Sequence, residues 1–260
     1  MPSNPEARSL AVFCDFENVA LGVREAKYAQ FDMEKVLERL LLKGSIVVKK
    51  AYCDWERYKE FKADMHGASF ELIEIPHVRQ SGKNSADIRM VVDALDLCYT
   101  KAHVDTFVIV SGDSDFSPLV SKLRENAKTV IGVGVKNSSS DLLIANCDEF
   151  IFYDDLVRAD EQKRRAAKKR RESSPPAEDK KQEAFDLLVE TLHALIGERG
   201  EGEHVWGSMI KQALKRRKPG FNESYYGFRA FSDLLEDAEK KGLIRLEPDE
   251  KSGGYLVRPA

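Results

Sequence analysis

The chain has 260 residues, 42% of them hydrophobic and 33% charged, with a formal net charge of −3 at pH 7. This composition excludes a disordered chain, and the length is sufficient for two domains. The sequence has no run of about eighteen apolar residues, so no helix that spans a bilayer is expected. Its polar start lacks the apolar core of a signal peptide, and its four cysteines are scattered within apolar runs. We therefore expect a cytoplasmic protein with reduced, buried cysteines.

Short apolar runs alternate with segments of helical periodicity between residues 10 and 156. Near-continuous apolar runs are typical of strands in a parallel sheet that is covered on both faces. The predicted strands are 10–13, 46–52, 70–75, 106–110 and 129–135. The predicted helices are 31–42, 88–95 and 116–126, and Asp32 and Ser85 are suitable N-caps for the first two. The alternation predicts a doubly wound α/β domain at residues 8–157.

A basic stretch at residues 158–182 separates this domain from the rest of the chain. Seven lysines and arginines fall between Lys163 and Arg171, and two serines and two prolines follow them. This composition predicts a linker whose first half continues as an exposed helix. A solvated spacer is the plain interpretation, and an arm that contacts phosphates is the alternative.

A second amphipathic pattern occupies residues 183–258. Three helices are predicted at 185–195, 209–214 and 231–238. Two short strands, 243–246 and 255–257, are predicted to be joined by a turn at Gly253 and Gly254. Three helices followed by a terminal hairpin describe a small winged-helix domain.

Acidic residues follow two of the predicted strands and begin one of the predicted helices. Asp15 follows the first strand, Asp113 and Asp115 follow the strand at 106–110, and Asp87 lies in the first turn of a helix. Ligands of open α/β sheets bind beyond the carboxyl ends of the strands. Clustered carboxylates repel one another unless a cation neutralises them, and hard oxygen ligands favour Mg²⁺ or Mn²⁺. Such an ion can promote the hydrolysis of a phosphodiester.

Each of these residues also has a plain interpretation. An aspartate after a strand is often a turn former or a helix cap, which applies most to Asp115, and Asp87 could complement a helix dipole. Asn18 is expected either to orient a ligand or to cap the segment that follows. A phosphatase with Asp15 as a covalent nucleophile is disfavoured, because such enzymes usually carry a second aspartate where this chain has Glu17.

Three motifs of the first domain resemble those of NYN domains, a branch of the PIN-like nucleases. They are Phe13–Val19, Gly82–Asp87 and Ser111–Phe116, and they occur in the order found in that family. The resemblance covers residues 10–156. It implies a PIN-like Rossmannoid fold in which a parallel sheet is flanked by helices, and it implies cleavage of RNA with Mg²⁺ or Mn²⁺. The acids that it implies as catalytic and metal-binding are Asp15, Asp87, Asp113 and Asp115.

The same motifs contain polar residues that are expected to support the acids. Asn18, Lys83 and Ser111 match polar positions of the NYN motifs. Some relatives have a shorter spacing between the lysine and the aspartate. Lys83 is therefore interpreted either as a phosphate contact or as a plain loop cation.

The C-terminal domain resembles the LOTUS domain, also called OST-HTH, which is a winged-helix-like module that binds RNA. The resemblance covers residues 183–257, and a Tyr-Gly-Phe turn at 226–228 before a Leu-Leu helix is its most specific part. Cations beside aromatic rings suit single-stranded RNA, although a basic helix end can also be merely solvated. The expected RNA-binding residues are Lys215, Arg216, Arg217, Lys218, Tyr225 and Tyr226.

The leading hypothesis is a metal-dependent ribonuclease that the second domain recruits to RNA. The alternative is a non-catalytic adaptor that binds RNA and uses the first domain as a scaffold. A complete acidic set argues against the adaptor, because a scaffold does not need clustered carboxylates. No membrane partner is expected, and assembly as a homodimer is left open.

Overall fold

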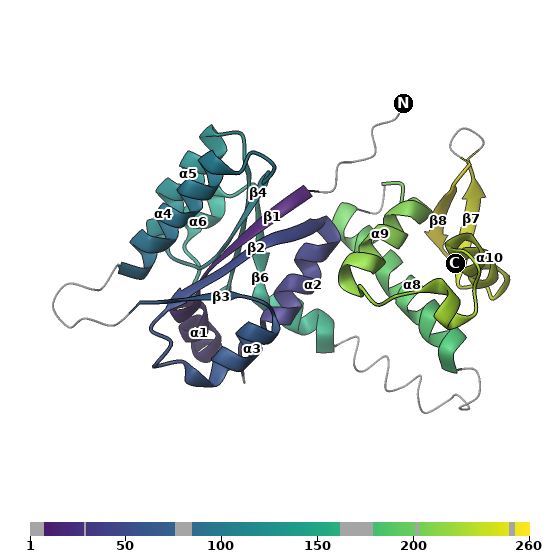
Figure 1. The fold of residues 1–260 in the computed structure, drawn as a ribbon, viewed down its shortest axis with the longest axis horizontal. Helices are drawn as coiled ribbons and strands as arrows, with labels where there is room; N and C mark the ends of the chain where they lie inside the picture. The colour runs from purple at the N-terminus through teal and green to yellow at the C-terminus, as the bar shows by residue number, and fades with distance from the viewer. Residues whose placement is uncertain (1–7, 29, 76–84, 162–178, 201–202, 250–252) are drawn as a thin grey trace. The chain divides into compact units, whose positions relative to one another are not determined.

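The computed structural model describes residues 8–28, 30–75, 85–161, 179–200, 203–249 and 253–260. The chain divides into two compact units, Met1–Ala166 and Ala167–Ala260, which we describe separately (Figure 1). Lys83 and most of the expected basic linker lie outside the described residues. Among the helices that are described, none is long and apolar enough to cross a membrane.

The first unit is built on a six-stranded sheet in which every neighbouring pair of strands is parallel. The strand order is β3-β2-β1-β4-β5-β6. The strands are β1 (Arg8–Asp15), β2 (Gly44–Cys53), β3 (Glu71–Glu74), β4 (Thr106–Val110), β5 (Thr129–Gly134) and β6 (Glu149–Phe152). The prediction of an α/β domain with a parallel sheet is confirmed. Strand β6 was not among the predicted strands.

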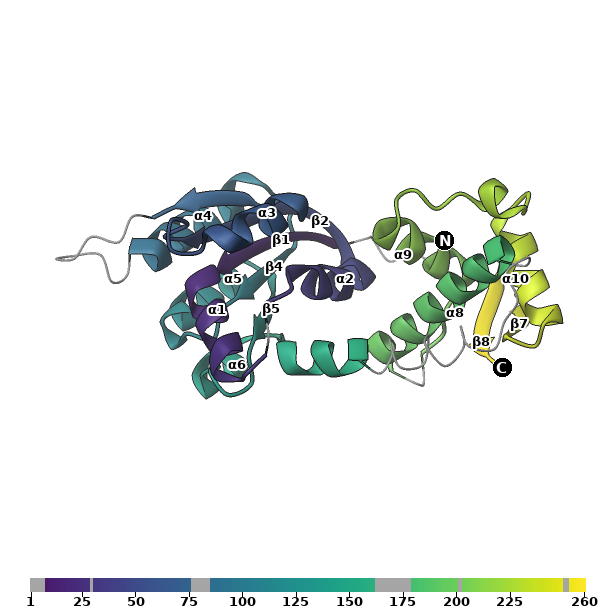
Figure 2. The ribbon, with the colours of Figure 1, turned by 90° about the horizontal axis from the view of Figure 1, so that it is seen from below.

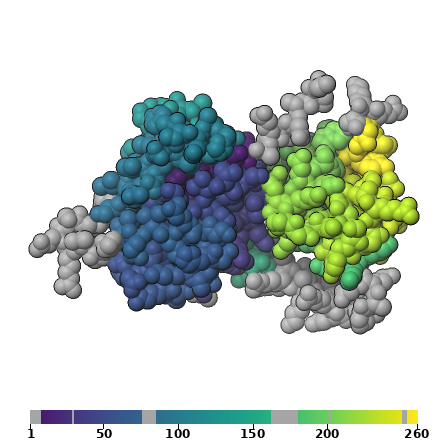
Figure 3. Space-filling view, in the orientation of Figure 1, coloured from purple at the N-terminus to yellow at the C-terminus, as the bar shows by residue number. Residues whose placement is uncertain are grey.

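Helices cover both faces of this sheet (Figure 1). On one face lie α1 (Phe16–Glu25), α2 (Met33–Lys43), α3 (Lys62–Gly67) and a helix at 153–161. On the other face lie α4 (Ser85–Thr100), α5 (Ser117–Glu125) and α6 (Asp141–Asn146). The described residues of this unit also form two short 3₁₀ helices, η1 (Lys59–Phe61) and η2 (Ser114–Phe116). The blue surface of α3 and the teal surface of α4 and α5 are distinct regions in the space-filling view (Figure 3).

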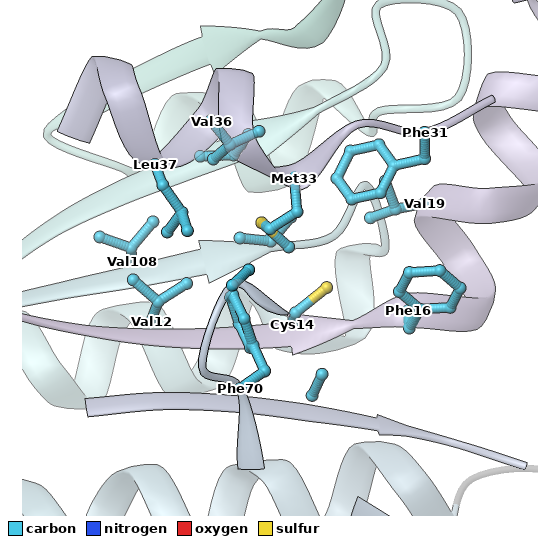
Figure 4. Close-up of a cluster of buried hydrophobic side chains, with 14 of the residues drawn as sticks. Val12, Cys14, Phe16, Val19, Phe31, Met33, Val36, Leu37, Phe70 and Val108 are labelled. Atoms are coloured by element: carbon cyan, nitrogen blue, oxygen red, sulfur yellow. The ribbon is translucent and has the colours of Figure 1, made fainter. Parts of the chain in front are cut away.

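The central strand β1 is buried on both faces because its side chains alternate between two cores. Val12 and Cys14 belong to the core beneath α1 and α2, which also contains Met33 and Leu37 of α2 (Figure 4). Ala11 and Phe13 belong to the core beneath α4 and α5. This double burial fixes the register of β1, because a shift by one residue would exchange the two sets of side chains.

The ends of helix α2 follow from its sequence. The Asp32 side chain accepts a hydrogen bond from Glu34 N at 3.1 Å, as expected of an N-cap. The helix ends at Lys43, directly before Gly44, which begins β2. Asp32 N also donates to Tyr153 Oη at 2.9 Å, so the start of α2 is tied to the residue that follows β6.

The described residues of the second unit form three main helices and a two-stranded antiparallel sheet (Figure 2). Its elements are α8 (Asp179–Arg199), α9 (Gly207–Arg217), η4 (Glu223–Tyr226), α10 (Phe231–Lys240), β7 (Ile244–Pro248) and β8 (Tyr255–Pro259). Trp206 adds an isolated antiparallel bridge to Leu256 of β8. Helix α8 begins at Asp179, so the last four residues of the expected linker at 158–182 are helical.

The turn between η4 and α10 has a specific backbone requirement. Gly227 has a φ of 84°, a left-handed conformation that glycine adopts without strain. Phe228 follows it and is buried, and its ring packs edge-on against Phe185 of α8 at 5.8 Å. Gly227 therefore turns the chain so that Phe228 enters the core of this unit.

Candidate functional site

The acidic site lies where the order of the sheet changes direction. Strands β1 and β4 are adjacent, and Cys14 is paired with Val110. Asp15 is the last residue of β1, and Ser111 directly follows β4. The chain leaves β1 toward one face through α1 and leaves β4 toward the other face through η2 and α5. Such a divergence opens a crevice at the carboxyl ends of the two strands.

Asp15 is held at this edge of the sheet by one group from α1 and one from the residue that follows β4. Its side chain is 7% exposed. Its Oδ2 accepts a 3.0 Å hydrogen bond from Ser111 Oγ. Its Oδ1 accepts a 3.3 Å hydrogen bond from Asn18 N and so caps α1. Asp15 therefore has the plain role of a helix cap as well as a position at the site.

A short network continues from Asp15 to the loop after β4. Ser111 Oγ accepts a hydrogen bond from Asp113 N at 3.2 Å, and Asn18 Oδ1 accepts one from Gly112 N at 2.8 Å. Asp113 caps η2, because its Oδ1 accepts from Asp115 N at 3.0 Å. The cap of this segment is therefore Asp113 and not Asp115, whose side chain is exposed. Asn18 orients the loop that carries Asp113.

The carboxylates of the site oppose one another's ionisation. Burial, followed by the charge of Asp87, raises the pKa of Asp15 from 3.8 to about 7 despite the hydrogen bonds that lower it. Partial burial, followed by the charges of Asp113 and Asp115, raises the pKa of Asp87 from 3.8 to about 6. Asp15, Asp87 and Asp113, which are far apart in the sequence, thus act on one another through space, and Asp115 acts on Asp87.

The donor set fits a hard divalent cation in its chemistry, because it consists of carboxylate oxygens whose ionisation a cation would favour. The side chains are not arranged as a finished ligand set. Within the described residues, no group of three or more His, Cys, Asp or Glu side chains is close enough to hold one ion. Binding an ion would therefore require the acidic side chains to turn toward it.

Gly112 lets a serine loop approach the acidic site. A Cβ atom on Gly112 would lie 2.4 Å from Ser138 O, which is too close for any side chain. Ser140 N donates to Gly112 O at 2.9 Å, and Ser140 caps α6 by accepting from Leu142 N. The sequence analysis did not identify this loop. The sequence signal for this loop is that small residues lie on both sides of the contact, Gly112 on one side and serines on the other.

Gly112→Ala is expected to destabilise the first unit by about 1–3 kcal/mol, because the added methyl must displace backbone. It should also lower activity, since the same residue donates to Asn18. Gly67→Ala is the matched control, because a Cβ there would have no atom within 4 Å. Thermal unfolding of both variants measures the difference. Equal stability of the two variants would show that the serine loop moves to accommodate the methyl group without loss of stability.

An ion pair at the rim of the site was also not foreseen. Arg57, in the segment after β2, pairs with Glu17 at 3.0 Å. Glu17 lies at the start of α1, and its charge contributes to the raised pKa of Asp87. Sequence spacing gives no signal for this pair, because its members are forty residues apart.

The basic run of the second unit is divided between buried and exposed positions. The Arg217 side chain is 7% exposed, and its guanidinium donates to Thr191 Oγ1 at 3.2 Å and to Glu190 Oε1 at 2.9 Å. Partial burial lowers the pKa of Arg216. Lys215 is exposed, and so is Lys218, the C-cap of α9. Arg217 thus joins α9 to α8, a structural role that the sequence analysis did not assign.

The two tyrosines of η4 lie beside one another at the surface of the second unit. Tyr225 is 60% exposed, and its ring meets that of Tyr226 edge-on at 5.0 Å. Lys180 Nζ lies 4.6 Å from the centre of the Tyr225 ring. The Tyr226 ring stacks on Phe221 at 5.3 Å. One ring is therefore anchored to the interior while its neighbour faces solvent.

Comparison with known proteins assigns a family to the first unit. A family model described as NYN domain matches residues 9–154. An uncharacterized protein of Methanocaldococcus jannaschii is 28% identical over 117 residues, which are 45% of this chain and 45% of that protein. The chain thus matches less than half the length of this curated relative. The crystal structure of a protein of unknown function from Vibrio parahaemolyticus is similar with a TM-score of 0.52 and 29% identity, over 60% of this chain and 98% of that one.

Proposed function

Because this chain belongs to the NYN domain family, which is nuclease-like, we propose that its first unit hydrolyses RNA phosphodiester bonds with a divalent metal ion. The observation that carries the proposal is the clustering of these carboxylates: burial, followed by their mutual repulsion, raises the pKa of Asp15 to about 7 and that of Asp87 to about 6. A protein that keeps such groups together without a cation loses stability. In a site that binds a cation, the same clustered negative charge attracts the ion.

The residues that would hold the ion are Asp15, Asp87 and Asp113, with the exposed Asp115 beside them. Mg²⁺ and Mn²⁺ are the ions that carboxylate oxygens favour. Such an ion, when bound, supplies activation of water and offsets the negative charge that develops on a phosphodiester during hydrolysis. Lys83, which would add a phosphate contact, lies outside the described residues.

The chain's own residues position the acids. Ser111 Oγ donates a hydrogen bond to Asp15 Oδ2 and accepts one from Asp113 N, so one hydroxyl links the two acidic residues. Asn18 holds Gly112 from the first turn of α1 and so links the ends of β1 and β4. This network fixes the backbone positions from which the side chains of Asp15 and Asp113 would turn toward an ion.

We further propose that the second unit is a LOTUS-like winged-helix module that binds RNA. Three helices followed by an antiparallel hairpin, with Trp206 bridged to β8, are consistent with such a module. Its RNA-binding surface is proposed to centre on Tyr225, Tyr226 and Lys180, with Lys215 and Lys218 at the end of α9. Aromatic rings stack on unpaired bases, and the lysines attract phosphates.

Tyr225→Ala is expected to weaken binding of a long single-stranded RNA to the full chain about tenfold, the usual loss for one stacked base. The fold should be retained, because this ring is 60% exposed. Tyr99→Ala is the matched control, since Tyr99 is 65% exposed but belongs to the first unit. Fluorescence anisotropy gives both affinities. Equal affinities of the two variants would remove Tyr225 from the RNA-binding surface.

The proposed activity is tested by incubating the purified chain and Mn²⁺ with labelled RNA and DNA of the same sequence. Products from RNA are expected. Tight RNA binding without products, with either Mg²⁺ or Mn²⁺, would instead favour the non-catalytic adaptor. Products from DNA alone would contradict the assignment of RNA as the substrate.

A further inference from the structure

The segment that follows β2 brings an arginine to the rim of the acidic site. Arg57 Nη1 donates a 3.0 Å hydrogen bond to Glu17 Oε1, and the two form an ion pair. Glu17 lies two residues after Asp15, close enough to Asp87 for its charge to act on that carboxyl. Strand β2 is paired with β1 so that Tyr52 lies opposite Asp15. Arg57 is therefore a cation placed beside a cluster of carboxylates.

The backbone around Arg57 is anchored, whereas its guanidinium remains accessible. The guanidinium carbon lies 6.0 Å from the centre of the Tyr58 ring. That ring meets Phe16 edge-on at 5.6 Å and Phe61 at 6.5 Å. Phe16 is fully buried, whereas the Arg57 side chain is 50% exposed. A cation that lies over one aromatic ring, itself packed against others, and faces solvent is suited to capture an anion.

Arg57 can readily exchange its ion pair with Glu17 for a contact with another anion. Ion pairs between partly exposed side chains contribute only about 0–1 kcal/mol. A guanidinium binds phosphate oxygens with the same paired geometry that it uses for a carboxylate. RNA carries a phosphate at every nucleotide, so a strand that occupies the acidic site presents further phosphates to its rim. A cation at that rim offsets their repulsion by the carboxylates.

We propose that Arg57 is a substrate-binding residue that holds a phosphate of the RNA backbone beside the acidic site, and that Glu17 keeps its side chain in place until RNA binds. This inference rests on the proposed ribonuclease function. It adds a contact outside the reacting centre, which favours a polynucleotide strand over a single nucleotide. On binding, the guanidinium exchanges the carboxylate of Glu17 for phosphate oxygens.

Steady-state cleavage of a short single-stranded RNA by the full chain tests this contact. Arg57→Ala is expected to raise KM about tenfold and to change kcat less than about twofold, because a flanking phosphate is held equally in the ground and transition states. Arg57→Lys keeps the charge but loses the paired geometry, so its KM should fall between those of the wild type and Arg57→Ala. Lys59→Ala is the matched control, because Lys59 is exposed in the same segment and pairs with Glu56. An unchanged KM in Arg57→Ala would overturn the proposal.

A second measurement does not depend on cleavage. The full-length Asp113→Asn chain in Mg²⁺ is treated with phenylglyoxal, which modifies accessible guanidinium groups, with and without the single-stranded RNA. Mass spectrometry should show that RNA lowers modification of Arg57 severalfold and leaves Arg24, exposed in the last turn of α1, unchanged. Absence of cleavage by the wild type would refute the ribonuclease function, whereas protection of Arg57 would still support the contact. Equal modification of Arg57 with and without RNA overturns the proposed contact, whether or not the wild type cleaves RNA.

Discussion

Changing Asp113 to asparagine is expected to lower RNA cleavage by about three orders of magnitude. The stabilisation that a metal ion gives to a phosphodiester in reaction is worth several kcal/mol, and each 1.4 kcal/mol is about tenfold in rate. Asparagine keeps the oxygen that accepts from Asp115 N at 3.0 Å, so η2 retains its cap. The variant loses the negative charge, which is the property that an ion requires.

The matched control for this variant is Asp32→Asn. Asp32 caps α2 through the same kind of hydrogen bond, to Glu34 N, and it lies apart from the acidic site. Initial rates on a labelled RNA should therefore be close to wild type for Asp32→Asn. Full activity in Asp113→Asn, with both variants folded, would remove Asp113 from the site.

Asp15→Asn is expected to abolish cleavage and yet to stabilise the metal-free protein at pH 8. The pKa of Asp15 is raised in the folded state from 3.8 to about 7, so between these values the folded chain holds a proton that the unfolded chain releases. Stability then falls as the pH rises from about 4 to about 7, and the loss is complete above that range. The shift of about three units corresponds to at most about 4 kcal/mol, an order-of-magnitude figure. Asparagine avoids this loss.

Thermal unfolding in EDTA measures this effect. The variant should unfold several degrees above the wild type at pH 8, and the difference should shrink as the pH falls toward 4. Asp87 titrates in both proteins, and its repulsion of Asp15 is absent from the variant, which stabilises the variant in the same direction at pH 8. Mg²⁺ should raise the melting temperature of the wild type and act less on the variant. A variant that is no more stable than the wild type at pH 8 would show that the buried charge of Asp15 does not destabilise the folded protein.

The elements of the first unit follow from local patterns, and the position of the acidic site follows from a topological rule. The alternation of apolar runs and helical segments predicts the parallel sheet, because strands buried on both faces must be apolar along their length. Asp32 caps α2 as predicted, and the helix ends at Lys43, one residue beyond its predicted end. Asp15 and Asp113 follow neighbouring strands, and parallel strands bring their carboxyl ends to one edge.

Other features depend on contacts that a linear pattern does not contain. Strand β6 was missed although the equally short β3 was predicted, and its place at the edge of the sheet is defined by its pairing with β5. The pair of Arg57 and Glu17 forms because β1 and β2 are adjacent, and adjacency is a property of the folded sheet. The buried position of Arg217 depends on how α9 packs against α8, which a run of basic residues does not reveal.

The most direct test of the account is whether RNA cleavage depends on a divalent metal ion. Purified wild-type chain is freed of metal with EDTA, assayed on labelled single-stranded RNA, and assayed again after addition of excess Mg²⁺ or Mn²⁺. A metal-dependent ribonuclease should show no cleavage in EDTA and recovery with one or both ions, with no recovery in Asp113→Asn. Cleavage by the wild type that continues unchanged in EDTA would contradict this metal dependence.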